Sequence, residues 1–553
     1  MTERISAREA ISLVTDSFAE LPSPGGEFRS DGPLSWTGYD DARARAAART
    51  GEEESVVCGT ATFGTASFGT TIDGRAPLGP ATAVLVAFEF GFLGGSLGER
   101  TGDRLEAAYD YARTHRLPVV SLVATGGSRM QEGMLALTQL QRVARQSALT
   151  RKAGLAQIAV LRDPTTGGGW ATLGAGADVT LALPGAQVAF AGSRVRPPDA
   201  DPAAYTAEAQ VVAGSVDALV PQDGLRETLA LWLDLLTRPG AGATSVPPAP
   251  SPASVPSALS PASVPPALSP PPVPPALGGT SVPPALGGTS VPPALGGTTD
   301  LPALGGTSVP VARGGASDLP ALGGATDPPS LGGTSAPPAP GGATDLPATG
   351  WDAVQRARSP ERPRADAYLD AYFSRRVSIG GDRCGGTDDG MVCGFGRARD
   401  GRTIAYAAQR GTPTRPAGYR TAARLVRLAG RLGIPVLTLV DTPGAANDAE
   451  AERQGAGAAI ADLFSAVATA RTPLTTLVIG EGGSGGALAL AAPGNTWATP
   501  DSYFSVIAPE AAAAILKRPA DEIRATAAQL RLRPQDLLDL GVIRGITRRR
   551  PGG

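Results

Sequence analysis

The sequence VIGEGGSGGALAL, residues 478–490, begins with an apolar run, passes through five glycines and ends in alanine and leucine. A second stretch, VLRDPTTGGGWATL at residues 160–173, has the same order of apolar run, glycines and apolar run. A helix that follows such glycines starts with unpaired backbone N–H groups, and a missing Cβ lets a ligand approach them. Both stretches therefore predict a strand-to-helix turn that either binds a ligand or is only a tight turn.

Each glycine stretch belongs to a longer series of alternating strands and helices. In the first half, an apolar run at 117–127 leads into a helical stretch at 130–149 and a strand at 156–164. In the second half, a strand at 434–445 leads into a helical stretch at 451–470. Strands that alternate with helices predict βαβ units and a largely parallel sheet. The repeated order predicts two related α/β domains.

A segment of different composition separates these halves. Residues 239–349 repeat VPPALGGTS and its variants at a period of nine residues. One Ala-Leu pair per repeat cannot build a core, so the segment is predicted to be a disordered linker rich in Pro and Gly. The sequence therefore predicts one domain at residues 1–238, the linker at 239–349, and a second domain at 350–553.

Composition excludes several classes of function. The net charge of −2 gives no argument for binding nucleic acid or a membrane surface. Cys58, Cys384 and Cys393 form no CxxC pair, which argues against a zinc ribbon or a disulfide framework and suits a reducing cytosol. His115 is the sole histidine and is expected at a helix C-terminus, so histidine-based catalysis and metal binding are not predicted. With neither a signal peptide nor an apolar run of membrane length, a cytoplasmic protein is expected.

The glycine loops are open to more than one interpretation. GEGGSGGA has no following Lys-Ser or Lys-Thr pair, so it is not a Walker phosphate loop. EFGFLGGSLGER, at 89–100, lacks a dinucleotide fingerprint. Amide donors at such a turn can also stabilise an oxyanion that develops on a thioester or a ureido group.

Longer motifs resemble a known family. FGFLGGSLGERTG, VATGGSRMQEGMLAL and LRDPTTGG resemble the β subunit of bacterial acetyl-CoA carboxylase carboxyltransferase. WDAVQRARSPERP, GYRTAARLVRLAGRLGIPVLTLVDTPGA, TLVIGEGGSGGALAL and YFSVIAPEAAAAIL resemble its α subunit. The resemblance covers roughly residues 1–235 and 350–545, and it identifies a β–α fusion.

The resemblance implies a crotonase-like ββα-spiral fold in each domain. It implies transfer of a carboxyl group from carboxybiotin, held on a separate carrier protein, to acetyl-CoA, which gives malonyl-CoA for fatty acid biosynthesis. The implied partners are a biotin carboxyl carrier protein, a biotin carboxylase and an acyl-CoA, and the chain is expected to form a homodimer or a higher homo-oligomer.

The family's motifs assign residues to the thioester side. Gly167 and Gly168 would hold the thioester oxygen as it becomes an enolate, and Gly126 and Gly127 would shape the same pocket. Arg129, with Arg194, would contact CoA phosphates, or else these two are solvated surface charges.

On the other side, Gly485 and Gly486 would hold the ureido oxygen of biotin, and Gly444 would line that pocket. Gln131 and Glu132 are expected to hold their loop and cap the helix that follows.

The sequence departs from the family in three places. In the family, a four-cysteine zinc ribbon precedes the segment that corresponds to ISARE. Here Met1 falls at that segment, so no metal is predicted. A basic stretch expected before GYRTAARL is missing, and DTPGAANDAEAERQG replaces a Pro- and Gly-rich loop, which would reshape the biotin side.

Two alternatives stay open. The chain could be a decarboxylase component that acts on a malonyl thioester, because malonate decarboxylase subunits share this pairing. It could instead be a non-catalytic scaffold for a carboxylase, although intact glycine pairs in both halves argue against that.

Overall fold

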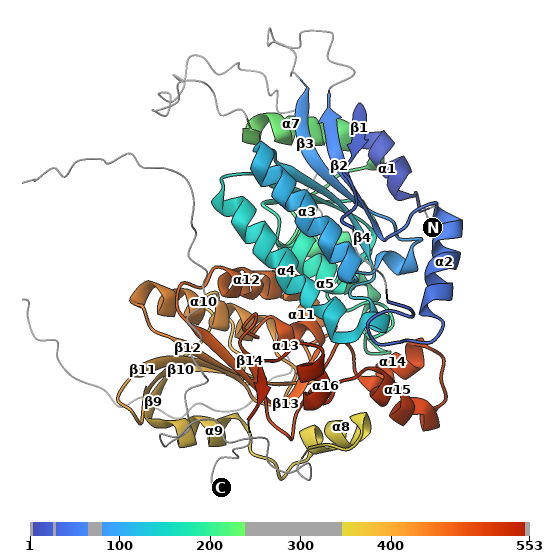
Figure 1. The fold of residues 1–553 in the computed structure, drawn as a ribbon. Helices are drawn as coiled ribbons and strands as arrows, with labels where there is room; N and C mark the ends of the chain where they lie inside the picture. Colours follow the sequence, from blue (N-terminus) through green and yellow to red (C-terminus); the bar gives the residue numbers. More distant parts are fainter. Residues whose placement is uncertain (1–3, 26–28, 65–79, 238–345, 548–553) are drawn as a thin grey trace, which may run out of the picture. The chain divides into compact units, whose positions relative to one another are not determined.

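A computed structural model describes residues 4–25, 29–64, 80–237 and 346–547. The described residues of both halves belong to one compact unit (Figure 1). The linker predicted at 239–349 lies outside the described residues, apart from its last four positions. No described helix is long and apolar enough to cross a membrane.

The first half contains one sheet and the helices that cover it. Its strands are β1 (Ser17–Glu20), β2 (Val56–Phe63), β3 (Ala81–Phe88), β4 (Val119–Thr125), β5 (Gln157–Thr166), β6 (Val179–Ala182), β7 (Val188–Ala189) and β8 (Ala218–Leu219). Its α-helices are α1 (Ala7–Val14), α2 (Tyr39–Thr50), α3 (Glu99–His115), α4 (Gly133–Lys152), α5 (Gly167–Gly169), α6 (Ala207–Val212) and α7 (Leu225–Thr237). Short 3₁₀ turns and one π-helical turn, η3 (Trp170–Gly174), complete it.

The second half is built from the same kinds of elements. Its strands are β9 (Phe373–Ile379), β10 (Met391–Ala398), β11 (Thr403–Gln409), β12 (Val436–Thr442), β13 (Leu474–Gly483), β14 (Thr496–Ala498), β15 (Tyr503–Ser505) and β16 (Gly545–Ile546). Its helices are α8 (Gly350–Arg358), α9 (Ala365–Tyr372), α10 (Pro416–Leu432), α11 (Ala449–Arg453), α12 (Ala456–Ala468), α13 (Ser484–Leu488), α14 (Pro509–Ile515), α15 (Ile523–Gln529) and α16 (Pro534–Asp539).

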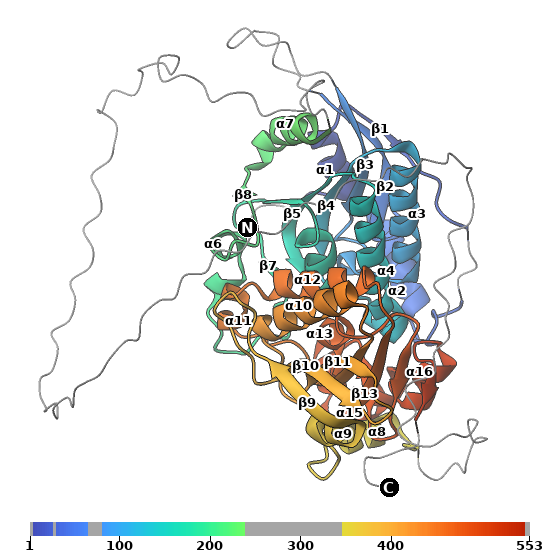
Figure 2. The same cartoon turned by 90° about the vertical axis from the view of Figure 1, so that its left-hand side faces the viewer.

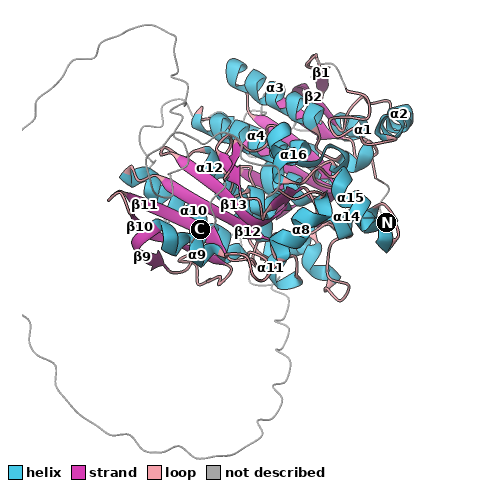
Figure 3. Cartoon of the chain, turned by 60° about the horizontal axis from the view of Figure 1, so that its bottom comes forward, coloured by secondary structure: helices cyan, strands magenta, loops and turns pink. Residues whose placement is uncertain are grey.

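The two sheets have the same topology, and Figure 3 shows their strands in magenta among the cyan helices. The described strands form an eight-stranded sheet in each half, ordered β1-β2-β3-β4-β5-β6-β8 and β9-β10-β11-β12-β13-β14-β16. In each sheet the first three strands pair antiparallel and the later pairs are parallel. A short extra strand, β7 or β15, pairs with the end of β5 or β13. The predicted duplication of a largely parallel α/β domain is therefore confirmed.

Local sequence explains the central elements. All seven residues of β4 are buried, as expected for a strand of a parallel sheet covered on both faces. Helix α10 begins with Pro416, which suits a first turn, and ends at Leu432, directly before Gly433, which has a left-handed backbone. Helix α3 ends at His115, as predicted.

One predicted helix is wrong in detail. The stretch at 451–470, expected as one helix, is divided between α11 and α12. Gly455 separates them with a φ of 74°, a left-handed conformation that interrupts a right-handed helix.

The described residues of the two halves share a hydrophobic core. Helices α3 and α4 lie along one sheet, and α10 and α12 lie along the other (Figures 1 and 2). Leu137 and Leu140 of α4 belong to the same buried cluster as Ile460 and Leu463 of α12. A side-chain amide also links the halves, since Gln141 Nε2 donates to backbone oxygens of the second half, at 2.8 and 3.3 Å. The described residues of the two halves are therefore joined directly, by apolar packing and by hydrogen bonds.

Candidate functional site

The first glycine loop joins β5 to α5. Gly167 has a φ of 66°, a conformation that favours glycine, and it opens a helical segment that continues into η3. Gly168 is buried, and a Cβ there would overlap the Leu140 side chain. The first amides of this helical segment have no intrahelical acceptor.

The second glycine loop joins β13 to α13 in the same way. Thr125 pairs with Thr165 across β4 and β5, and Thr442 pairs with Gly482 across β12 and β13. This register makes Gly168 equivalent to Gly485, and Gly167 equivalent to Ser484. Ser484 has a φ of 56°, which costs a non-glycine residue on the order of 1 kcal/mol.

The pairs predicted from the motifs are therefore staggered by one residue. Gly167 and Gly168 occupy the first two helical positions of their loop, whereas Gly485 and Gly486 occupy the second and third of theirs. Gly486 is closely enclosed, because a Cβ there would lie 2.5 Å from the backbone nitrogen of Ala445. Gly485 has more room, since the nearest atoms to its Cβ position are 3.4 and 3.5 Å away.

A companion loop lies beside each glycine loop, after β4 and after β12. Gly127 donates to Thr125 Oγ1 at 3.0 Å, and Gly444 donates to Thr442 Oγ1 at 3.1 Å. Both glycines have positive φ values, 102° and 144°. The repeated hydrogen bond shows that the two companion loops have the same local frame.

The structure brings the predicted glycines together within each half. A Cβ on Gly167 would lie 3.2 Å from Cα of Gly127, and a Cβ on Gly126 would lie 3.3 Å from the Gly94 oxygen. In the second half, a Cβ on Gly444 would lie 3.5 Å from the Gly483 oxygen. Each half thus joins two strand ends into one cluster of bare backbone.

Two side chains lie between the glycine clusters of the two halves, and the sequence did not predict a role for either. Leu140 contacts the Cβ position of Gly168 and lies 3.5 Å from that of Gly485. The Phe190 ring, which is partly exposed, lies 3.4 Å from the same Gly485 position. Both residues are apolar and lie outside the chemical motifs, so no signal in the sequence distinguished them from ordinary core.

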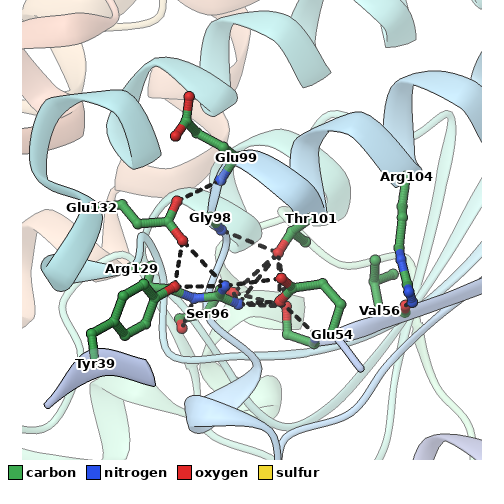
Figure 4. Close-up of polar contacts among 11 residues, drawn as sticks. Tyr39, Glu54, Val56, Ser96, Gly98, Glu99, Thr101, Arg104, Arg129 and Glu132 are labelled. Atoms are coloured by element: carbon green, nitrogen blue, oxygen red, sulfur yellow. Dashed lines mark hydrogen bonds and ion pairs between the residues drawn. The ribbon is translucent and has the colours of Figure 1, made fainter. Parts of the chain in front are cut away.

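Arg129 is not on the surface (Figure 4). Its side chain has no exposed area and makes ion pairs with Glu54 and Glu132. It also donates to Tyr39 Oη at 3.2 Å and to the Ser96 oxygen at 2.7 Å. The surface-charge interpretation is wrong, and since these donors point at protein acceptors, we assign Arg129 to holding the companion loop rather than to CoA.

Burial and charge act against each other in this cluster. Burial alone would lower the pKa of Arg129, but the carboxylates of Glu54 and Glu132 outweigh it and raise that pKa. Burial likewise opposes ionisation of Glu54, and the Arg129 guanidinium outweighs it and lowers the pKa of that carboxyl. Arg129 and Glu54 therefore each favour the charged form of the other, and each depends on its partner.

Glu132 caps a different helix from the one predicted. Its carboxylate accepts the backbone N–H of Glu99 at 2.6 Å, at the first turn of α3, and makes no side-chain cap on α4 (Figure 4). It also accepts a hydrogen bond from Tyr39 Oη. Gln131 is partly exposed beside it, and Arg194 is exposed.

The second half has its own buried ion pair, on the strand rather than on the loop. Asp441, near the end of β12, pairs with Arg362 at 2.6 Å, and both side chains are almost completely buried. The same carboxylate accepts the Glu481 N–H at 3.2 Å. This pair ties β12 and β13 to the segment between α8 and α9.

The arrangement suits chemistry on oxyanions. Each cluster offers helix-start amides and a bare, close-packed backbone, and the described residues contain no group of three His, Cys, Asp or Glu placed to hold a metal ion. Such donors stabilise negative charge that develops on a carbonyl or ureido oxygen.

Comparisons with known proteins agree with this chemistry. A family model described as "Carboxyl transferase domain" matches residues 41–216, and one described as "Acetyl co-enzyme A carboxylase carboxyltransferase-like" matches residues 346–553.

Relatives match along almost the whole chain. The acetyl-coenzyme A carboxylase carboxyl transferase subunits beta/alpha of Saccharopolyspora erythraea are 32% identical, across 94% of this chain and 77% of the relative. Those of Salinispora arenicola are 33% identical, across 97% of this chain and 81% of the relative. The separate alpha subunit of Methylobacterium sp. strain 4-46 is 43% identical, across 37% of this chain and 68% of the subunit.

A solved structure of transcarboxylase 12S covers 99% of this chain and 87% of its own, at 18% identity and a TM-score of 0.33. That likeness is too weak to carry an argument.

The family models and the full-length relatives define the class of this protein as a biotin-dependent carboxyltransferase. The chain belongs to the acetyl-CoA carboxylase carboxyltransferase family, with the β-type half before the α-type half. The resemblance read from its motifs is confirmed.

Proposed function

We propose that this chain transfers a carboxyl group from carboxybiotin to acetyl-CoA or a related acyl thioester, which gives malonyl-CoA or its homologue. The observation that carries the proposal is the pair of equivalent glycine loops, one in each half, which share a contact with Leu140. Full-length relatives named for the same activity support it.

On the thioester side, amides of the loop at Gly167 and Gly168 would stabilise the oxygen as the enolate forms. Gly126 and Gly127 place no side chain of their own in that space. Arg129 holds their loop through its hydrogen bond to the Ser96 oxygen.

On the biotin side, Gly485 and Gly486 would offer amides to the ureido oxygen, and Gly444 would line the approach. The residues fit a planar ureido group with one polar oxygen, since bare backbone lies beside the partly exposed Phe190 ring. Biotin, when bound, supplies the carboxyl group and a base for the α-proton, so a side-chain base is not required.

The proposal includes a wider setting. Each half would have a crotonase-like fold, and the domains would span 1–238 and 350–553. Biotin would sit on a separate carrier protein that a biotin carboxylase loads. The enzyme would work as a homodimer or higher homo-oligomer in the cytoplasm, where its three cysteines, free in the structure, would stay reduced.

The reverse reaction tests the activity. Purified full-length protein with malonyl-CoA and biocytin should release acetyl-CoA only when biocytin is present. Release of CO2 without biocytin would instead support the decarboxylase, and no product of either kind would favour a scaffold.

A single methyl group tests the biotin side. Gly485→Ala should fold, because its new Cβ meets only the side chains of Phe190 and Leu140 at ordinary or slightly tight distances. The methyl should displace biocytin from the loop and lower its kcat/KM about a hundredfold, the usual loss for an oxyanion donor. Gly430→Ala, with its nearest neighbour 3.8 Å from the Cβ position, is the matched control. Unchanged biocytin kinetics in folded Gly485→Ala would refute the assignment.

The thioester side needs a compensated variant. Gly168→Ala alone overlaps Leu140, so a loss of activity there would not separate binding from packing. Adding Leu140→Ala removes the obstructing side chain. If Gly168 serves the thioester, the double variant should still use malonyl-CoA poorly, whereas Leu140→Ala alone should retain more of that activity.

A further inference from the structure

The segment that follows β12 in the α-type half packs into the β-type half. Asn447 Nδ2 donates to the Val195 oxygen at 2.7 Å, and Tyr205 Oη donates to the Asn447 oxygen at 2.9 Å. Arg453 forms an ion pair with Asp201. We call these contacts, between residues 447–453 and residues 187–210, the cross-half clamp.

Glu452 is the buried centre of the cross-half clamp. It has no exposed surface, and its carboxylate accepts the backbone N–H of Ala191 at 2.8 Å. The N–H of Phe190 also faces this carboxylate, and Gln210 Nε2 lies 3.5 Å away. These backbone donors follow β7 directly, so Glu452 satisfies N–H groups that the short strand leaves without a ladder partner.

Phe190, whose backbone N–H faces Glu452, in turn contacts the α-type half. Phe190 belongs to the β-type half, yet its Cζ lies 3.4 Å and its Cε2 3.8 Å from the Cβ position of Gly485. The segment after β12 that carries Gly444 continues into α11, which carries Glu452, and the Glu452 carboxylate reaches the backbone of Phe190. The Phe190 ring contacts the glycine loop of the α-type half at Gly485.

Glu452 is a costly way to hold a loop. A buried carboxylate loses its hydration, and burial raises the pKa of Glu452 to about 7 despite the N–H donors of Ala191 and Phe190 and the charge of Arg196. Among the described residues, the cation whose charge acts on this carboxyl is Arg196, and that charge does not offset burial. An apolar residue would avoid this cost but would leave the N–H groups of Ala191 and Phe190 without their acceptor, so Glu452 holds the backbone of these two residues.

We propose that Glu452 is a positioning residue for the biotin side of the site: through the backbone of Phe190 and Ala191, it fixes the Phe190 ring against Gly485. The Phe190 ring is then one wall of the surface that the biotin ring meets. This inference rests on the proposed function, because it takes the loop at Gly485 to serve biotin.

The test uses full-length protein in the reverse reaction, with malonyl-CoA and biocytin varied in turn. Glu452→Ala should lower kcat/KM for biocytin at least about tenfold and change KM for malonyl-CoA less than about twofold. Phe190→Ala should have the same selectivity. The double variant should have a kcat/KM for biocytin only slightly below that of the less active single variant, because both substitutions break the same contact.

Two further variants keep the test decisive. Glu450→Gln changes an exposed glutamate of the same short helix and should match the unsubstituted enzyme. Glu452→Gln keeps one acceptor oxygen for Ala191 and should regain part of the biocytin kcat/KM. If a thermal melt shows that Glu452→Ala is unfolded, the biocytin kinetics of Glu452→Gln and Phe190→Ala provide the test.

Three results would overturn the inference: equal losses for both substrates, fully additive effects of Glu452 and Phe190, or normal biocytin kinetics in Glu452→Gln and Phe190→Ala. Absence of biocytin-dependent activity in the unsubstituted protein would instead refute the proposed function, so the two failures are distinguishable.

Discussion

The companion loops after β4 and β12 have the same backbone but different supports. In the first, the Leu97 N–H donates to the Gly127 oxygen at 2.9 Å, and the Arg129 N–H returns to the Leu97 oxygen at 2.8 Å. In the second, the Thr414 N–H donates to the Gly444 oxygen at 3.1 Å, and the Ala446 N–H donates to the Thr414 oxygen at 2.9 Å. Arg129 and Ala446 are therefore equivalent positions.

Their side chains make the difference. Arg129 secures its loop inside the β-type half, through Glu54, Ser96 and Tyr39 (Figure 4). Ala446 has only a methyl group, so no charged side chain at this position secures its loop. Arg415 and Asp448 form one ion pair within the α-type half, but both side chains are about 40% exposed.

The second companion loop continues into α11, and the cross-half clamp ties this segment to the β-type half. The comparison indicates that the β-type half organises its own glycine cluster, whereas the α-type half depends on its partner half to complete one. The duplicated backbone thus supports two different ways of fixing a glycine-containing loop.

The largest expected effect comes from breaking the internal anchor. Arg129→Met removes the cation and leaves Glu54 buried without its ion-pair partner, so the free energy of unfolding should fall by about 3–5 kcal/mol. Denaturant unfolding measures this change. Arg142→Met, which breaks ion pairs that are more than one-third exposed, should cost less than about 1 kcal/mol. Equal losses in the two variants would contradict the internal anchor.

The next effect concerns the cross-half clamp and depends on pH. Because the folded pKa of Glu452 is raised from its ordinary value of 4.5 to about 7, folded Glu452 keeps a proton between these values that the unfolded chain has lost. Stability from this group is therefore present at low pH and is lost as pH rises to about 7. The groups that face it from the other half are Arg196, Tyr205 and Gln210.

Relative to Glu452→Gln, the unsubstituted protein should lose about 3 kcal/mol of unfolding free energy between pH 4.5 and pH 8. The measurement is denaturant unfolding of both proteins across this range. Parallel stability curves would show that burial does not raise this pKa, and Glu450→Gln should give parallel curves as the exposed control.

The smallest effect is expected at the edge of the cross-half clamp. Arg453 and Asp201 are each about half exposed, so Arg453→Ala should change the free energy of unfolding by less than about 1 kcal/mol. Its biocytin kinetics should stay within about twofold of normal. A loss as large as that of Glu452→Ala would show that the clamp acts through its exposed ion pair rather than through Phe190.

The sequence by itself determined the elements and their order. Apolar runs such as 117–127 and 434–445 became the buried strands β4 and β12, because such runs are stable only between two covered faces. Glycines after strands were correctly placed at strand-to-helix turns, since the backbone requirement there is local. Family motifs of this length also sufficed to identify the class of enzyme.

Contacts distant in sequence were decided only by the tertiary structure. No local pattern showed that Arg129 is buried, that Glu132 caps α3 instead of α4, or that Ser484 occupies the place of Gly167. The bond between Ala191 and Glu452 joins residues 261 positions apart. Periodicity reports which face of an element is buried, but not which partner covers it, so these roles depend on how the two halves pack against each other.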